Sequence, residues 1–153
     1  MKVAIGCDHA GVELKDKVKA LLIRLGHAVL DYGTNTTDSV DYPDYAREVA
    51  LAVSEGRADR GVVICWTGNG TNITANKVRG VRSGLALNRD MAYYTRLHND
   101  ANVLSMGQKY VSEDIWEDIV TTFLDTEFEG GRHKRRVDKI SALEDEYVRS
   151  SLE

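Results

Sequence analysis

The stretch Val62-Val63-Ile64-Cys65-Trp66-Thr67-Gly68-Asn69-Gly70-Thr71 runs from an apolar strand directly into a glycine-bearing loop. A short continuous apolar run is typical of a strand buried on both faces of a parallel sheet. Ligands of open α/β sheets bind where such strands end. The segment 71–78 can begin a helix, whose N-terminal amides attract anions and favour the thiolate form of a nearby cysteine. The pattern therefore predicts a chemical role for Cys65 rather than core filling.

Segments typical of strands and helices alternate along the rest of the chain. Strands are expected at residues 3–6, 28–31, 61–65, 83–87 and 102–106, and helices at 12–25, 43–53, 71–78, 89–97 and 112–123. Pro43 opens the second of these helices, and Ser112 is expected to cap the fifth. Alternating strands and helices with right-handed crossovers favour a doubly wound α/β domain with three layers and five parallel strands. We expect residues 1–153 to form this single domain.

The C-terminal region combines a basic stretch with helical periodicity. Val137, Ile140, Leu143 and Tyr147 predict a final helix over residues 137–151 that is exposed or packs on a partner subunit. Before it, Gly130, Gly131 and His133 indicate a shaped loop. The basic residues of this region are Arg132, Lys134, Arg135, Arg136 and Lys139. On a protein of net charge -4 they suit a small anionic ligand better than nucleic acid, although a solvated helix face would also explain them.

Composition excludes several other classes. No apolar stretch is long enough for a membrane span, and the first residues enter a strand without a signal-peptide pattern. Cys7 and Cys65 are too few for a disulfide framework and have no metal-like spacing. Reduced thiols in the cytoplasm are the simplest expectation.

The ends of parallel strands meet at one edge of a sheet, and polar residues follow several of the expected strands. These are Cys7, Asp8 and His9; Cys65, Thr67, Gly68, Asn69 and Gly70; Asn88 and Arg89; and Gly107 and Lys109. The polar loop 32–42 is expected to cover this side. His98, Asn99 and Asp100 instead end a helix, so they should lie at the opposite edge. His98 could join the site only through a loop excursion or from a second subunit.

Several of these residues also have structural interpretations. Asp8 and His9 could cap a helix, and His98 could be a helix C-terminal residue favoured by the dipole. Cys7 could be a small buried hydrophobe. Trp66 could be a packing residue or a lid, and the sequence does not decide between them.

Six motifs together resemble a known family. They are Gly6-Cys7-Asp8-His9-Ala10-Gly11, Asp41-Tyr42-Pro43, Cys65-x-Thr67-Gly68-x-Gly70, Ala75-Asn76-Lys77, His98-Asn99-Asp100-Ala101-Asn102 and Glu129-Gly130-Gly131-Arg132-His133-x-x-Arg136-Val137. Their order and spacing, from Lys2 to about Glu144, resemble the type B ribose-5-phosphate isomerases and the related galactose-6-phosphate isomerase subunits. The resemblance implies a Rossmann-like homodimer, sometimes paired into a tetramer, with active sites shared between subunits. It also implies aldose-ketose isomerisation of a phosphorylated sugar without metal or organic cofactor.

The resemblance implies roles for individual residues. Cys65 would be the base that moves a proton between C1 and C2 through an enediolate, whose oxyanion the amides of Gly68 to Gly70 would stabilise. Thr67 or His98 would help to open the sugar ring, with His98 as proton donor. The expected substrate-binding residues are Asp8 and Asn99 for hydroxyl groups, His9, Arg132 and Arg136 for the phosphate, and Tyr42, Trp66, Gly68, Asn69, Gly70 and Lys109 around them.

Two residues depart from the family pattern. Trp66 stands where most relatives have glycine, and Lys109 stands where they tend to have arginine. Ribose 5-phosphate is the first expected substrate. The alternatives are another phosphosugar such as a 6-phosphohexose, or a non-catalytic subunit of a hetero-oligomer. A cysteine phosphatase would need arginine at position 71, where this chain has threonine. A flavodoxin-like nucleotide binder fits poorly, because Cys7-Asp8-His9 follows the first strand.

Overall fold

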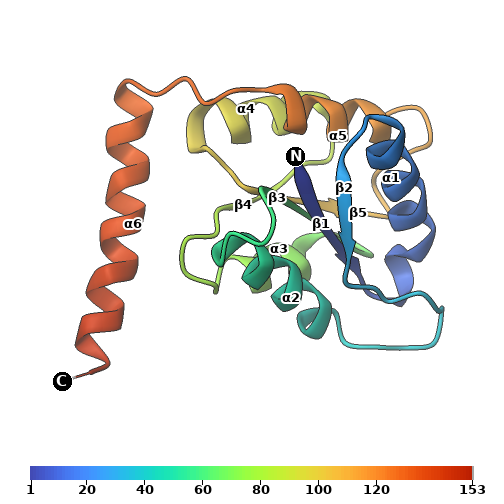
Figure 1. Cartoon of the computed structure of the whole chain (residues 1–153), viewed down its shortest axis with the longest axis horizontal. Helices are drawn as coiled ribbons and strands as arrows, with labels where there is room; N and C mark the ends of the chain where they lie inside the picture. Colours follow the sequence, from blue (N-terminus) through green and yellow to red (C-terminus); the bar gives the residue numbers. More distant parts are fainter. Residues whose placement is uncertain (153) are drawn as a thin grey trace.

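The computed structural model describes residues 1–152 and contains a five-stranded parallel sheet (Figure 1). The strands are β1 (Lys2–Cys7), β2 (Ala28–Asp31), β3 (Arg60–Cys65), β4 (Ser83–Leu85) and β5 (Val103–Gly107). Their order is β2-β1-β3-β5-β4. The chain winds outward from β1 to β2 and then returns to β3 on the other side of β1. The sheet therefore has its switch point between β1 and β3, where ligands of such folds bind.

Helices cover both faces of the sheet, which confirms the predicted three-layer, doubly wound fold. One face packs against α1 (Val12–Arg24), α4 (Arg89–Asn99) and α5 (Trp116–Asp125), and the other against α2 (Tyr42–Ser54) and α3 (Asn69–Ala75). A short 3-10 turn, η1 (His9–Gly11), precedes α1. Alternate residues of a strand face opposite sides, so Ile5 joins the α1 side and Ala4 the α2 side.

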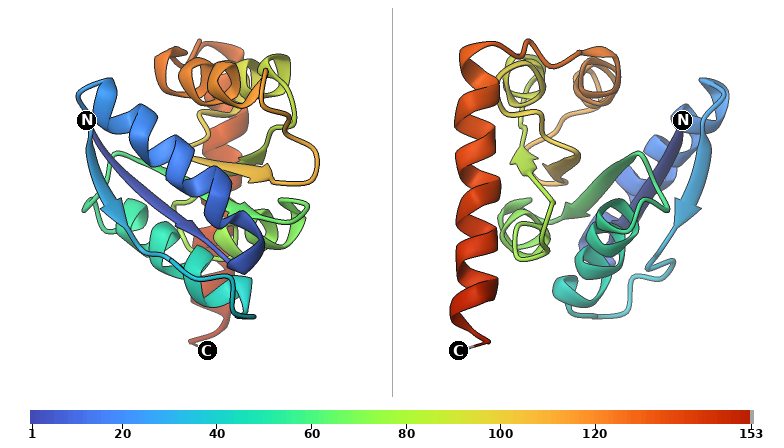
Figure 2. Two further views of the ribbon diagram at one scale, coloured as in Figure 1. Left: turned by 90° about the vertical axis from the view of Figure 1, so that its right-hand side faces the viewer. Right: turned by 60° about the vertical axis from the view of Figure 1, so that its left-hand side comes forward.

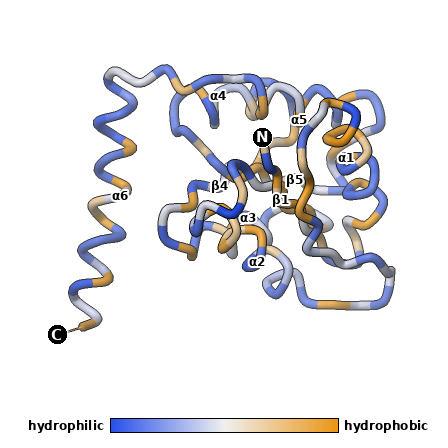
Figure 3. Tube along the Cα trace, in the orientation of Figure 1, coloured by the Kyte–Doolittle hydropathy of each residue, from blue (hydrophilic) through white to orange (hydrophobic). Residues whose placement is uncertain are grey.

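The last helix, α6 (Arg132–Ser150), stands beside this three-layer body (Figures 1 and 2). It is held there by the Glu144 carboxylate, which accepts the Gly80 amide at 3.0 Å, and by an ion pair between Asp145 and Arg79. Hydrophobic residues recur along an otherwise hydrophilic helix (Figure 3). Leu143 is 54% exposed and Tyr147 is 72% exposed. The helix thus presents apolar side chains that this chain does not cover.

Three predicted helix starts were wrong by two residues or more, for local reasons. The final helix begins at Arg132 rather than residue 137, because Gly130 and Gly131 have positive φ angles and turn the chain directly into it. Arg132 and His133 therefore belong to its first turn and not to a loop. Ser112 does not cap α5, which begins at Trp116: its hydroxyl donates to the Asp114 carboxylate, and its side chain accepts no amide of this helix.

The third boundary concerns α3, which begins at Asn69 instead of residue 71. Its N-cap is Gly68, whose φ of 81° reverses the chain immediately after Thr67. Asn69 and Gly70 thus lie in the first helical turn. Among the helices of residues 1–152, none has the length and apolar character that crossing a bilayer requires.

Candidate active site

Cys65 is the last residue of β3 and lies at the carboxyl edge of the sheet, as the sequence predicts. Its side chain is almost buried, with 4% of the residue exposed. The Gly68 amide donates to Sγ at 3.2 Å, and the Thr71 hydroxyl donates to it at 3.4 Å. These two donors hold the sulfur in place at the switch point of the sheet.

Behind the sulfur lies a buried hydroxyl network that sequence reasoning missed. The Ser105 hydroxyl donates to the Gly68 carbonyl at 2.7 Å, and its oxygen lies 2.9 Å from the Thr71 hydroxyl. Ser105 and Thr71 are both buried. The available signal was a serine inside the otherwise apolar strand Val103–Gly107, because a buried polar side chain needs a hydrogen-bonding partner. The network fixes the loop that carries Cys65.

Close packing explains the glycines of this loop. A Cβ on Gly68 would lie 2.8 Å from the backbone carbon of Met106, and one on Gly107 would collide with the Thr67 carbonyl. A Cβ on Gly70 would lie 2.5 Å from the Tyr42 ring. The ring of Tyr42 therefore lies directly on the first turn of α3, which places this predicted residue beside the Cys65 loop.

Asp8 and His9 follow β1 at the same edge. The Asp8 carboxylate accepts the Ala10 amide at 3.0 Å and caps η1, so its structural interpretation is confirmed and its substrate contact stays a prediction. His9 Nδ1 accepts the Val40 amide at 3.2 Å, so the proton of the neutral ring is on Nε2. The loop before α2 thus reaches over this edge, as expected.

Trp66, which directly follows Cys65, lies next to Lys109. The Lys109 amide donates to the Trp66 carbonyl at 2.9 Å, and the Lys109 Nζ lies 5.6 Å from the centre of the Tyr110 ring. Trp66 is 52% exposed, which excludes the interpretation as a core packing residue. The exposed indole lies next to the Cys65 loop, where it can limit the size of a ligand that reaches the sulfur.

Cys7 differs from Cys65 although both end strands. It is fully buried, and its thiol donates to the Thr34 carbonyl at 3.5 Å. Burial raises the pKa of the Cys7 thiol to about 12. This thiol is neutral at physiological pH, and its interpretation as a small buried hydrophobe is confirmed.

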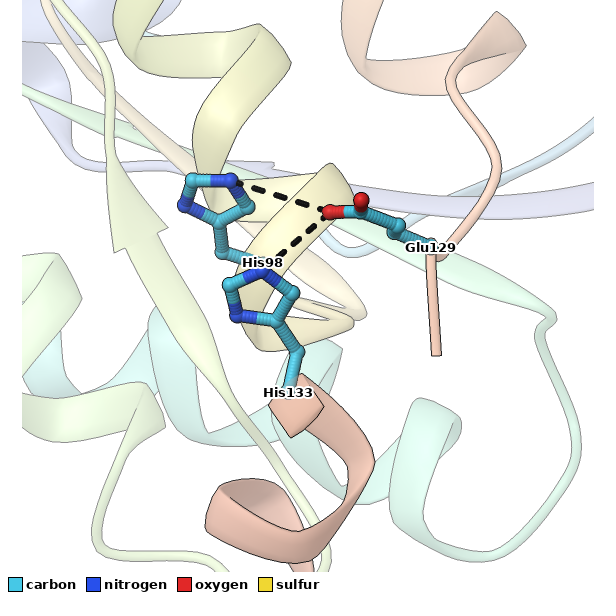
Figure 4. Close-up of side chains that lie close together, drawn as sticks. All are labelled: His98, Glu129 and His133. Atoms are coloured by element: carbon cyan, nitrogen blue, oxygen red, sulfur yellow. Dashed lines mark ion pairs between the residues drawn. The ribbon is translucent and has the colours of Figure 1, made fainter. Parts of the chain in front are cut away.

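His98 lies elsewhere, in the last turn of α4, together with His133 and Glu129 (Figure 4). The two imidazole rings stack with centroids 4.1 Å apart and planes 11° apart. The Glu129 Oε2 lies 3.1 Å from Nε2 of His133 and 4.0 Å from Nε2 of His98. Burial, helped by the positive charge of neighbouring groups, lowers the pKa of His133.

The predicted site residues therefore fall into two groups that one chain does not bring together. The thiol half comprises Asp8, His9, Tyr42, Cys65, Trp66, Thr67, Gly68, Asn69, Gly70 and Lys109 at the carboxyl edge. The basic half comprises His98, Asn99, Arg132 and Arg136, with Glu129 and His133 between them. The helix α4 runs antiparallel to the strands and leads into the start of β5, so its C-terminal end lies at the edge of the sheet where the strands begin. This separation is what the sequence predicts for His98.

The sequence profile of the family described as "Ribose/Galactose Isomerase" matches residues 3–140. The chain belongs to this isomerase family. It is 44% identical over 143 residues to ribose-5-phosphate isomerase B of Escherichia coli, covering 94% of this chain and 96% of that protein. The Clostridium thermocellum ribose-5-phosphate isomerase B structure matches with a TM-score of 0.94 and 49% identity, covering 96% and 99% of the two chains. The Mycoplasma genitalium enzyme, solved with bound ribulose-5-phosphate, matches with a TM-score of 0.91 and 39% identity, covering 95% and 97%.

The isomerase family match includes both halves of the site, since it runs from β1 into α6. Among residues 1–152, one group of side chains could hold a metal ion: His98, Glu129 and His133. Their ligand atoms lie within 4.8 Å of one another. The rings of His98 and His133 are nearly parallel, so their nitrogen lone pairs point side by side and not toward one point. The positive charges of Arg132 and Arg136 lie close enough to lower the pKa of His133, and they would also repel a cation. The geometry therefore fits a carboxylate beside two stacked imidazoles better than a tetrahedral metal site.

Proposed function

We propose that this protein interconverts ribose 5-phosphate and ribulose 5-phosphate through an enediolate, with Cys65 as the base. The observation that carries the proposal is the Cys65 sulfur at the switch point of an isomerase-family fold, held by the Gly68 amide and the Thr71 hydroxyl. A thiolate that accepts two hydrogen bonds, next to a solvent-facing rim, is suited to remove a proton from carbon.

The proton transfer follows from the chemistry of an open-chain aldose. Cys65 takes the hydrogen from C2, and the electron pair forms the C1–C2 double bond while negative charge moves to the carbonyl oxygen. Return of that proton to C1, with transfer of the C2 hydroxyl proton to the oxygen on C1, gives the ketose. Because the Gly68 amide is engaged with the sulfur, we assign stabilisation of the oxyanion to the Gly70 amide, which lies in the first turn of α3.

The remaining residues of the thiol half orient the sugar. The Thr67 oxygen accepts the Asn69 amide at 3.3 Å, so its hydroxyl hydrogen is available for a sugar oxygen. His9 presents its protonated Nε2 to the phosphate, and Asp8 accepts from a sugar hydroxyl. Tyr42, Trp66, Asn69 and Lys109 enclose the substrate from the rim of the site.

The basic half acts in the site of a second copy of the chain. His98 donates a proton to the ring oxygen, Asn99 binds a hydroxyl, and Arg132 and Arg136 bind the phosphate with their guanidinium forks. The exposed apolar side chains of α6 support a homodimer, because an uncovered apolar helix face is an interaction surface. Dimers can pair further into a tetramer. We place the enzyme in the cytoplasm, where the free thiols of Cys7 and Cys65 stay reduced.

A mixing experiment tests the base and the shared site together. The variants Cys65→Ala and His98→Ala should each lose about two to four orders of magnitude in turnover of ribose 5-phosphate. Unfolded and refolded together, they form heterodimers in which one of the two sites has both residues intact. Recovery of activity would support the shared site, whereas full activity of Cys65→Ala alone would overturn the base. No turnover by the unmodified protein on any pentose or hexose phosphate would overturn the function.

A 6-phosphohexose is the second candidate substrate. Trp66 supports a changed sugar preference, because its exposed indole occupies a position at the rim of the thiol half. Measuring kcat/KM for ribose 5-phosphate beside a panel of hexose 6-phosphates decides between the two.

A further inference from the structure

The side chain of His98 is held on two sides by aromatic rings. His133 stacks on one face with centroids 4.1 Å apart, and the Tyr94 ring lies 4.9 Å away at 49°. About a third of the His98 side chain stays exposed. The ring is therefore fixed in orientation and still open to a ligand, as a proton donor must be.

Glu129 is fixed against the same ring from the loop before α6. Its amide donates to the Leu97 carbonyl at 3.0 Å, which ties the loop to the end of α4. Its carboxylate then reaches the Nε2 edge of both imidazoles, at 4.0 Å from His98 and 3.1 Å from His133 (Figure 4). The backbone contact explains why this exposed carboxylate is directed toward the stacked pair.

The two histidines differ in burial and in hydrogen bonding. His133 is buried, its Nε2 makes no well-aligned hydrogen bond, and its pKa is lowered. Burial therefore disfavours a positive charge on His133. The Glu129 carboxylate also faces His98, which is the more exposed ring of the pair.

The other charged groups around His98 do not replace Glu129. Arg132 and Arg136 of α6 are positive and oppose a protonated imidazole. The Asp100 carboxylate accepts from Arg96 at 2.8 Å and from Arg82 at 3.3 Å, so its charge is already compensated. Glu129 is the carboxylate left to favour the imidazolium.

We propose that Glu129 is a positioning residue for His98 in the opening of the sugar ring, an inference that rests on the proposed isomerase function. In this step the C1–O bond of the furanose breaks and its electron pair goes to the ring oxygen, which takes the proton of His98. The C1 hydroxyl loses its proton to water and becomes the aldehyde. Glu129 acts by orienting and stabilising the protonated imidazole, and it does not touch the sugar.

The test compares a sugar that must be opened with one that is always open. Ribose 5-phosphate forms a furanose ring, whereas a tetrose 4-phosphate cannot, because phosphate occupies the hydroxyl that would close it. Glu129→Gln should lower kcat on ribose 5-phosphate about tenfold or more, since a general acid contributes about 10²- to 10⁴-fold. Its KM for ribose 5-phosphate and its turnover of the tetrose 4-phosphate should stay within about twofold of the unmodified enzyme, the range expected when binding and proton abstraction are intact.

Two further variants separate positioning from a general effect on the loop. Glu129→Asp keeps the charge and should recover part of the lost rate. Glu127→Gln makes the same change two residues earlier, at an exposed position of the same loop, and should behave as the unmodified protein. Equal loss on both sugars, no loss on either, or the same loss in Glu127→Gln would overturn the inference.

If the unmodified enzyme does not turn over the tetrose 4-phosphate, deuterium uptake at C1 of ribulose 5-phosphate in heavy water replaces it. This ketose is also open-chain, so uptake requires proton abstraction and not ring opening. Glu129→Gln should keep the uptake rate, and a parallel loss of uptake and of ribose 5-phosphate turnover would overturn the inference. Inactivity of the unmodified protein would instead reject the proposed function.

Discussion

Replacing Thr71 by valine removes a hydrogen-bond donor from the Cys65 sulfur while keeping the shape of a buried side chain. The Thr71 hydroxyl lies 3.4 Å from Sγ, and it also lies 2.9 Å from the Ser105 oxygen. Ser105 donates to the Gly68 carbonyl at 2.7 Å independently of Thr71. The valine variant removes one of the two donors to the sulfur, together with the Thr71 contacts to Ser105 and, at 3.2 Å, to the Gly68 carbonyl, while Ser105 still anchors the loop.

The magnitude follows from the charge on the acceptor. A hydrogen bond to a charged group contributes about 1.5–3 kcal/mol, and one between neutral groups about 1 kcal/mol. The thiolate loses the larger amount and the neutral thiol the smaller. Since about 1.4 kcal/mol corresponds to a tenfold change, Thr71→Val should lower kcat on ribose 5-phosphate about three- to thirtyfold. Its free energy of unfolding should fall by only about 1 kcal/mol.

The matched control is Thr74→Val on the same helix. The Thr74 hydroxyl donates to the Gly70 carbonyl at 2.8 Å, within its own helix, so its removal does not reach the sulfur. Steady-state turnover of ribose 5-phosphate and urea unfolding of both variants provide the comparison, and Thr71→Ser should restore part of the rate. Wild-type turnover by Thr71→Val, or an equal loss in Thr74→Val, would refute the reasoning.

Three other changes have defined outcomes. Burial alone raises the pKa of the Asp31 carboxyl, but hydrogen bonds from two lysines and a backbone amide outweigh it and hold the pKa below its ordinary value. Asp31→Asn should therefore lower the Tm at pH 7, and calorimetry should show the difference from the unmodified protein shrinking as pH falls through about 4, since only the unfolded state binds the proton there. Trp66→Gly should change the ratio of kcat/KM between pentose and hexose phosphates more than it lowers total turnover, and an unchanged ratio excludes the indole from sugar selection. Gly68→Ala should lose about 2–5 kcal/mol of unfolding free energy, because the new methyl group clashes with its neighbours and the positive φ is also unfavourable for alanine. Gly26→Ala is the control: its φ is 82° but the space around it is open, so urea unfolding should show a loss of only about 1–2 kcal/mol.

The fold and the thiol half could be predicted because their signals are local. The run Val62-Val63-Ile64 is apolar on both faces, and the structure buries it on both faces. Glycine after Thr67 predicts a tight loop, and Gly68 does adopt a positive φ there. These features depend on neighbouring residues, so the sequence contains them directly.

The missed features depend on contacts between distant segments. Residues 132–136 are polar throughout and give no apolar periodicity, so the first turns of α6 could not be recognised from pattern. Ser105 is 34 positions from Thr71, and only the pairing of β3 with β5 brings their hydroxyls together. The stack of His98 on His133 likewise requires the loop after α5 to return to the end of α4.

Under the proposed function, the separation of the two halves links catalysis to association through α6. Its first turns carry Arg132 and Arg136, and its later turns carry Leu143 and Tyr147 on an uncovered face. A helix is stiff over this length, so an apolar contact that seats its later turns on a second subunit also fixes where its arginines lie. A monomer would keep the Cys65 sulfur and its two donors, because those contacts lie within one chain. It would lack His98, Arg132 and Arg136 at that sulfur, so the proposed chemistry requires assembly even though its base does not.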